Sequence, residues 1–339
     1  MSTLRLDPDY QRAVAPFATI VPPVADDAAT LRRFNNAAIA ASMTLYHVPE
    51  NNTTETKLDY TSLDGTPLTL HRFTPGPNNT TTTTTSPAGK PAVLYIHGGG
   101  FVSGSVPLFR KDIIAYATLS NTTFFAPAYR LAPESPHPLP LQDIYAALEY
   151  LHAHAAELAI DPARIALMGV SAGGGLAAAA ALLARDRRLE PRVARLVLVY
   201  PMLDDRTRLG GEGSLLSGHL TWTEKKNEIG WGAYLGDGAA RGRDGGDDDG
   251  GATGKVPQQY AAPARAEDVS GLPRTYIDVG GLDLFRGECM EFGARLASAL
   301  VDVEFHLYPG VPHAWEWVSG NAPVTKQAVE NRVRVLRDL

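Results

Sequence analysis

The sequence predicts an α/β fold in which helices cover both faces of a mainly parallel sheet. From residue 91 onward, short apolar segments alternate with longer helical stretches. Strands of parallel sheets are buried on both faces and are therefore typically continuous apolar runs. The chain has 339 residues, 44% of them hydrophobic, which is enough to bury a large core. We expect one large domain, or such a domain with an attached lid.

The alternating part of the chain predicts six strands and five helices. The strands are expected at residues 92–97, 123–126, 164–168, 194–200, 275–280 and 303–308, and the helices at 107–120, 138–156, 172–186, 284–300 and 323–338. Ahead of them, alternating segments at 57–63 and 68–73 flank an Asp-Gly-Thr-Pro sequence, which is typical of a hairpin. This hairpin is expected to add antiparallel strands at one edge of the sheet.

Other segments interrupt or precede this alternation. Residues 9–46 show helical patterning broken by two prolines, and a further helix is expected at 223–234. Residues 75–90 contain six consecutive threonines and are predicted to be a solvated linker. The Gly/Asp-rich run 236–254 could be imagined as a calcium loop, but its acidic spacing does not match an EF-hand. We expect a disordered insert there.

Composition excludes several classes of function. The formal net charge is −6, and the basic residues are scattered, so no nucleic-acid footprint is expected. The single cysteine, Cys289, excludes an internal disulfide framework and a thiolate metal cluster, and it is expected to be buried. The first ten residues lack the apolar region of a secretory signal, and no run of eighteen apolar residues occurs. The sequence therefore predicts a cytoplasmic protein without a membrane segment.

Two glycine-rich motifs each follow an expected strand. Residues 97–100 read His-Gly-Gly-Gly, and residues 169–173 read Gly-Val-Ser-Ala-Gly. Small residues on both sides of Ser171 allow a sharp turn from strand to helix, which exposes the serine hydroxyl as a nucleophile. The glycines of the first motif offer backbone N–H groups that can approach a developing oxyanion. Together the two motifs predict acyl transfer.

A nucleotide-binding fold is the main rival interpretation. A phosphate-binding turn ahead of a helix has the same glycine spacing as Gly169, Gly173 and Gly175. Such a fingerprint normally opens its domain, whereas here it follows several expected strands. None of the thirteen tyrosines has a lysine four residues later, so the catalytic pair of short-chain dehydrogenases is missing. We therefore prefer acyl transfer.

A reactive serine needs a base, and two histidines compete for that role. His306 and His313 are the only histidines after residue 219. His306 alternates within an expected strand and is most simply a strand residue. His313 lies just beyond that strand, on a loop where catalytic groups commonly occur. The sequence therefore favours His313 as the base.

The base in turn needs an acid that orients it. Asp278 lies inside an expected strand, whereas Asp283 lies in the following loop, from which it can reach the neighbouring strand's histidine loop. We prefer Asp283, although a helix N-cap is its alternative structural role. Asp204 and Asp205, which follow another strand, are lesser candidates.

From residue 91 to residue 315 the chain resembles the hormone-sensitive lipase family of α/β-hydrolases, also called family IV esterases. The five matching motifs are His97-Gly98-Gly99-Gly100-Phe101, Tyr129-Arg130-Leu131-Ala132-Pro133-Glu134, Gly169-Val170-Ser171-Ala172-Gly173-Gly174, Asp283-Leu284-Phe285-Arg286-Gly287-Glu288 and His313-Ala314-Trp315. Two positions depart from the family: Val170 replaces its usual acidic residue, and Gly287 replaces its usual aspartate. Both departures lie next to the matched triad positions and not at them.

The resemblance implies a role for each matched residue. Ser171 corresponds to the nucleophile, Asp283 to the orienting acid and His313 to the base. The backbone N–H groups that correspond to the oxyanion hole belong to Gly99, Gly100 and Ala172. Family members also carry a helical cap, which implies a division of this chain into cap (1–50), hydrolase core (51–204), cap insertion (205–268) and hydrolase core (269–339).

The expected function is a serine carboxylesterase that hydrolyses short- to medium-chain esters of small molecules without a cofactor or metal. Four aromatic residues are candidates for substrate binding: Phe101, Trp222, Trp231 and Tyr234. They could equally pack the cap against the sheet. An amidase or deacetylase with the same triad, and a non-catalytic ligand receptor on the same scaffold, are the alternatives. The sequence also leaves room for a homodimer.

Overall fold

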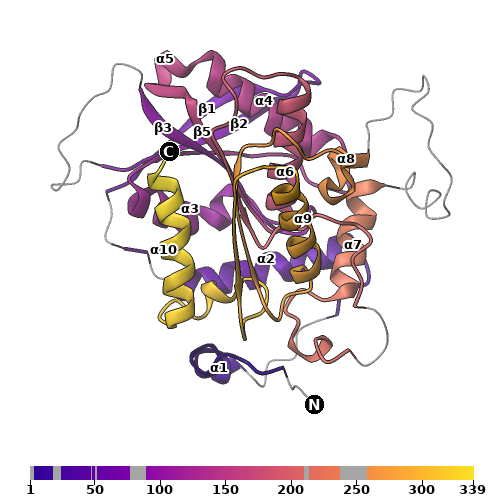
Figure 1. Ribbon diagram of the computed structural model, residues 1–339. Helices are drawn as coiled ribbons and strands as arrows, with labels where there is room; N and C mark the ends of the chain where they lie inside the picture. Colours follow the sequence, from indigo (N-terminus) through magenta and orange to yellow (C-terminus); the bar gives the residue numbers. More distant parts are fainter. Residues whose placement is uncertain are drawn as a thin grey trace.

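The computed structural model describes residues 4–17, 24–46, 48–49, 52–76, 89–209, 214–236 and 258–339. It shows a central sheet flanked by helices (Figure 1). Most of the expected threonine-rich linker and of the Gly/Asp-rich run, at 77–88 and 237–254, lies outside the described residues. The predictions for those two segments therefore remain predictions.

The sheet has eight strands in the order β1-β2-β4-β3-β5-β6-β7-β8. Their bounds are β1 Thr54–Thr61, β2 Pro67–Thr74, β3 Lys90–Ile96, β4 Thr123–Pro127, β5 Ile160–Val170, β6 Arg195–Val199, β7 Arg274–Gly280 and β8 Val303–Tyr308. The hairpin β1–β2 lies at one edge, and β2 pairs antiparallel with β4. All other pairs are parallel. The predicted strands and the edge hairpin are confirmed.

Helices cover both faces of this sheet, as predicted. Their bounds are α3 Val106–Ser120, α4 Leu139–Ala153, α5 Ala155–Leu158, α6 Ala172–Asp186, α9 Arg286–Ser298 and α10 Pro323–Arg337. Figure 1 shows α3 and α10 on one side, with α6 and α9 on the other. The small side chains of the alanine-rich α6 let this helix lie close to β5 and β6. The helix expected at 138–156 is divided at His154, and α9 begins two residues late because a turn precedes it.

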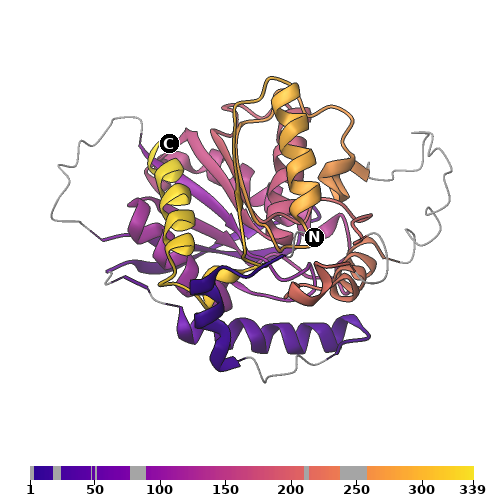
Figure 2. The ribbon, with the colours of Figure 1, turned by 60° about the horizontal axis from the view of Figure 1, so that its bottom comes forward.

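The remaining helices lie outside this layered core. They are α1 Pro8–Val14, η1 Ala15–Phe17, α2 Ala28–Leu45, η2 Ser217–His219, α7 Glu224–Leu235, α8 Gln258–Ala261, η4 Pro263–Arg265 and η5 Trp315–Trp317. The Asp27 side chain caps α2 by accepting from the Thr30 N–H at 2.7 Å. Figure 2 shows α2 extended across one end of the molecule, and α2 contacts α7. The division of the chain into core and cap stays a prediction.

The order of the strands reverses at β3. The chain leaves β3 to form β4 on one side and then returns to form β5 on the other. In open α/β sheets, ligands bind beyond the carboxyl ends of the strands at such a reversal. Ile96, the last residue of β3, pairs with Gly169 near the end of β5, so the two glycine-rich motifs emerge side by side.

Cys289 is fully buried in α9, as predicted, and its thiol is 3.4 Å from the Pro201 carbonyl oxygen. In the part of the chain that the structure describes, no helix is both long enough and apolar enough to cross a membrane.

A buried arginine connects four secondary-structure elements. Arg332 of α10 is fully buried and forms ion pairs with Asp278 of β7 and Glu316 of η5, each at 2.6 Å. It also donates to the Tyr116 hydroxyl of α3 at 3.0 Å. Burial raises the pKa of Asp278, and the positive charge of Arg332 opposes that effect. The guanidinium therefore compensates carboxylates that would otherwise be costly to bury.

We expect Arg332→Leu to lower the free energy of unfolding by about 3–5 kcal/mol, because Asp278 and Glu316 would remain buried without a cationic partner. Urea denaturation at neutral pH measures this loss. The matched control is Arg334→Leu, which removes an exposed ion pair with Glu304 and should cost no more than about 1 kcal/mol. Equal midpoints for the two variants would contradict a stabilising role for Arg332.

Candidate active site

Ser171 occupies a strained turn between β5 and α6. Its φ is +57° and its ψ is −121°, and its backbone N–H donates to the Val199 carbonyl of the neighbouring strand at 2.9 Å. A Cβ atom at Gly169 would lie 2.1 Å from the Gly173 oxygen, and one at Gly173 would lie 2.2 Å from the Ile96 oxygen. Only glycine fits at these two positions. The turn can therefore be sharp enough to present the serine hydroxyl, as the motif predicts.

The structure brings Ser171, His313 and Asp283 together in one chain of hydrogen bonds. His313 Nε2 is 2.9 Å from Ser171 Oγ, and His313 Nδ1 is 2.7 Å from Asp283 Oδ2. Asp283 follows β7 and His313 follows β8, so adjacent strands deliver the two side chains. Because an ionised carboxylate only accepts hydrogen bonds, Nδ1 carries the proton and Nε2 accepts from the serine hydroxyl.

The competing histidine and aspartates lie elsewhere. His306 is 2.7 Å from Glu304 on its own strand, and Asp278 pairs with Arg332. The two lesser candidates are also engaged in ion pairs, Asp204 with Arg206 and Asp205 with Arg265. Asp283 does not cap α9 in the expected way, since Phe285 holds the N-cap position. Instead its Oδ1 accepts from the Phe285 N–H at 2.9 Å, which fixes the carboxylate plane.

Aromatic rings enclose His313 on two sides. The Tyr200 ring lies edge-on at 4.6 Å between centroids, and the Phe285 ring lies edge-on at 5.2 Å. The Tyr200 hydroxyl donates to Glu316 at 2.8 Å, which connects the ring to the Arg332 network. Thr221 Oγ1 also donates to the His313 carbonyl at 2.8 Å. Neither Tyr200 nor Thr221 lies in a recognisable motif, so no sequence pattern indicates their contacts with His313.

The His-Gly-Gly-Gly segment forms a tight loop beside Ser171. Gly99 and Gly100 have φ values of +127° and +60°, and a Cβ at Gly99 would lie 2.0 Å from the Ser103 carbonyl oxygen. Among the hydrogen bonds of the described residues, none uses the backbone N–H of Gly99, Gly100 or Ala172 as donor. The Ala172 N–H also lies in the first turn of α6, where the helix dipole is positive. That these three N–H groups bind an oxyanion stays a prediction.

His97 orders this loop from within. Its imidazole stacks between Phe109 and Tyr129, at centroid distances of 5.4 and 4.3 Å, and its Nδ1 is 2.8 Å from the Gly98 carbonyl oxygen. Burial lowers the pKa of His97 to about 4, so the ring is neutral at pH 7 and donates through Nδ1. Because a trans peptide is planar, fixing the Gly98 carbonyl points the Gly99 N–H in the opposite direction.

The four aromatic candidates for substrate binding gather next to this loop. A Cβ at Gly100 would lie 2.2 Å from Cη2 of the Trp222 ring, so the indole lies directly against the glycine. Phe101 stacks on Tyr234 at 4.1 Å and meets Trp231 at 4.8 Å between centroids. All four rings are buried. Their position next to the candidate site is therefore established, whereas a contact with substrate stays a prediction.

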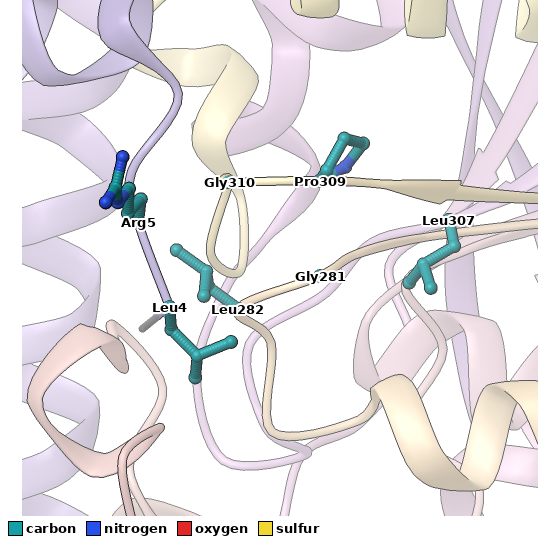
Figure 3. Close-up of a pocket in the computed structure, with 7 residues that line it drawn as sticks. All are labelled: Leu4, Arg5, Gly281, Leu282, Leu307, Pro309 and Gly310. Carbon is teal, nitrogen blue, oxygen red and sulfur yellow. The ribbon is translucent and has the colours of Figure 1, made fainter. Parts of the chain in front are cut away.

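A separate pocket of about 340 Å³ is lined in part by residues of the segments that follow β7 and β8 (Figure 3). Its lining residues come from the N-terminal segment and from the ends of β7 and β8: Leu4, Arg5, Gly281, Leu282, Leu307, Pro309 and Gly310. None of them is a candidate site residue. Among the described residues, no group of three or more His, Cys, Asp and Glu side chains is arranged to hold a metal ion.

Fold and site geometry together are those of a hydrolase, and comparison with known proteins gives the family. Residues 93–317 match a family model described as the alpha/beta hydrolase fold. The chain belongs to this family, as the resemblance to hormone-sensitive lipase esterases predicted. It is 30% identical over 257 residues to esterase LipI of Mycobacterium tuberculosis, which covers 73% of this chain and 72% of the relative. It is 31% identical to carboxylesterase NlhH of the same species, with 73% of each chain covered.

Solved structures agree with this assignment. The fold resembles a bacterial heroin esterase with a TM-score of 0.79, 34% identity and 98% of each chain covered. It also resembles esterase LipW of Mycobacterium marinum with a TM-score of 0.76 and 26% identity, covering 98% of this chain and 96% of that one.

We expect the stability of the protein to fall between about pH 6.5 and pH 4, in part because of His97. The unfolded chain binds a proton at this side chain near its ordinary pKa of 6.5, whereas the folded chain resists it down to about 4. Acid therefore favours the unfolded state across that interval. Urea denaturation at several pH values should show a shallower loss for His97→Asn than for the wild type. An equally steep loss would contradict the buried neutral imidazole.

Proposed function

We propose that the protein is a serine carboxylesterase that hydrolyses short- to medium-chain carboxylic esters through an acyl-enzyme. The continuous hydrogen-bond chain from Ser171 through His313 to Asp283 carries this proposal. Family membership supports it, as do relatives named esterases and carboxylesterases. The presence of His313 next to Ser171 argues against the receptor alternative, because a receptor does not need a general base.

In the first half of the reaction, Ser171 Oγ attacks the ester carbonyl carbon while His313 Nε2 takes the hydroxyl proton. Asp283 holds the imidazole in the required tautomer and stabilises its positive charge. The negative oxygen of the tetrahedral intermediate accepts from the N–H groups of Gly99, Gly100 and Ala172. When the carbon–oxygen bond breaks, His313 gives its proton to the departing alcohol.

In the second half, water replaces the alcohol. His313 takes a proton from the water as its oxygen attacks the acyl carbon, and the same three N–H groups stabilise the second tetrahedral intermediate. Collapse of this intermediate breaks the bond to Ser171 Oγ and returns the proton to it. The products are one carboxylic acid and one alcohol, and the free enzyme is restored.

The aromatic cluster supports the proposed preference for shorter acyl chains. Trp222 lies against Gly100, and Phe101, Trp231 and Tyr234 pack together beside it, so large rings occupy the space next to the proposed oxyanion donors. In our proposal the segments 1–50 and 205–268 form the cap that carries most of these rings. Localisation in the cytoplasm and formation of a homodimer stay predictions.

Ser171→Ala should lower kcat by at least about 10⁴-fold and abolish the covalent adduct with a fluorophosphonate probe, because the nucleophile is lost. His313→Ala should lower kcat to a similar extent. His306→Ala is the matched control and should leave kcat unchanged, since His306 pairs with Glu304 away from the site. Steady-state rates on p-nitrophenyl butyrate and intact-protein mass spectrometry measure both effects. A labelled and active Ser171→Ala protein would exclude the proposed nucleophile.

The kcat/KM for p-nitrophenyl esters should be highest for acyl chains of about two to eight carbons, because bulky rings limit the pocket beside the serine. A series from acetate to palmitate tests this preference. The rate on tributyrin should also show no jump at the solubility limit of that substrate. A maximum at palmitate, or activation by the emulsion, would instead define a true lipase.

A further inference from the structure

The orientation of one peptide group decides whether the Gly100 N–H can act as an oxyanion donor. The Gly99 carbonyl and the Gly100 N–H belong to the same planar trans peptide, so they point in opposite directions. Glycine backbones rotate freely, and both residues have positive φ. The direction of the Gly100 N–H therefore depends on what holds the Gly99 carbonyl.

Three donors converge on the Gly99 carbonyl oxygen. Two are backbone groups, the N–H of Ser103 at 3.0 Å and the N–H of Val102 at 3.3 Å. The third is the Ser103 hydroxyl, and at 2.6 Å it makes the shortest of the three contacts. Because a carbonyl oxygen can only accept, the single hydroxyl proton of Ser103 must point toward Gly99.

The Ser103 hydroxyl receives a hydrogen bond from outside the loop. Asn35 Nδ2 of α2 donates to Ser103 Oγ at 2.6 Å, across 68 positions of sequence. Ser103 is fully buried, which leaves this amide as the partner for its oxygen lone pair. The amide keeps the hydroxyl proton directed at the Gly99 carbonyl.

Neighbouring side chains of α2 hold the same loop in place. Asn36 Oδ1 accepts from the Gly104 N–H at 2.8 Å. Arg32 donates to the Val102 carbonyl at 2.5 Å and to the Ala132 carbonyl at 2.6 Å. Residues of α2 on both sides of Asn35 therefore bind the loop. These contacts hold the Asn35 amide at a fixed distance from Ser103.

We propose that Asn35 is a positioning residue of the oxyanion hole, and that its amide aligns the Gly100 N–H through the Ser103 hydroxyl and the Gly99 carbonyl. This proposal rests on the proposed function. It assigns to α2 an indirect part in stabilising the transition state, through the direction of one peptide group.

The decisive variant is Asn35→Asp, which keeps the size of the side chain but replaces the donor by an acceptor. The Ser103 hydroxyl would then donate its hydrogen bond to the carboxylate of residue 35, which removes the shortest contact to the Gly99 carbonyl. Loss of a whole oxyanion donor costs about 10²–10³ in kcat, so we expect Asn35→Asp to lower kcat about 10- to 100-fold with little change in KM. Asn35→Ala leaves the Ser103 proton in place and should lower kcat less.

A lower kcat for Asn35→Asp than for Asn35→Ala distinguishes a positioning role of Asn35 from a packing role. A side chain that only fills space would be better replaced by the isosteric aspartate than by alanine, which predicts the reverse order. The matched charge control is Ala38→Asp, an added carboxylate on the exposed face of α2, and it should leave kcat unchanged. Inhibition constants for a trifluoromethyl ketone, whose serine adduct carries an oxyanion, should rise in proportion to the loss in kcat/KM.

Ser103→Ala provides an independent test should a variant of Asn35 fail to fold. It should lower kcat by itself, and in its background Asn35→Asp should have almost no further effect, because both changes break one relay. Additive losses, or a kcat for Asn35→Asp equal to that of Ala38→Asp, would overturn the proposal. If Ser171→Ala remained active, the proposed function would fail first, and that outcome is distinct from an intact serine mechanism without a role for Asn35.

Discussion

The buried ion pairs of Arg332 are the constraint on which the rest of the molecule depends. One guanidinium joins the last helix to β7, to η5 and to the Tyr116 hydroxyl of α3. Asp278 lies five residues before Asp283, and Glu316 lies three residues after His313. Each loop of the candidate site is therefore next to a residue that pairs with Arg332. The Arg332 network thus holds residues close in sequence to Asp283 and His313, whose side chains are 2.7 Å apart.

The glycine-rich loop needs side-chain contacts to fix the direction of its peptide groups, because glycine itself restricts them little. The loop beside Ser171 uses glycine because any Cβ would collide with neighbouring backbone or with Trp222. That choice removes the steric restrictions which normally set backbone direction. The neutral His97 ring and the Ser103 hydroxyl replace those restrictions by holding two successive carbonyls, Gly98 and Gly99. The glycine backbone is therefore held by two side chains of the same loop, and one of these, Ser103, is in turn contacted by Asn35 of α2.

Features that depend on neighbouring residues could be predicted from the sequence, whereas contacts between distant segments could not. The strands and the hairpin could be predicted because periodicity is a pattern of consecutive residues. Ser171, Asp283 and His313 could be selected because each lies in a short segment that directly follows a predicted strand. Without the family resemblance, Asp278 and Asp283 could be ranked only by their positions in a strand or a loop, and in the structure Asp278 pairs with Arg332. Asn35 and Ser103 are 68 positions apart, and their contact produces no periodic pattern of residues. It therefore could not be predicted from a single sequence.

The arrangement of these segments along the chain also has a consequence for biosynthesis. The serine turn is complete once α6 has been translated, but the histidine follows it by 142 positions and Arg332 is made later still. A nascent chain therefore contains Ser171 before the residue proposed to accept its proton has been made. In the proposed mechanism the serine can react only after His313 has been translated, so shorter nascent chains carry the serine without its proposed proton acceptor.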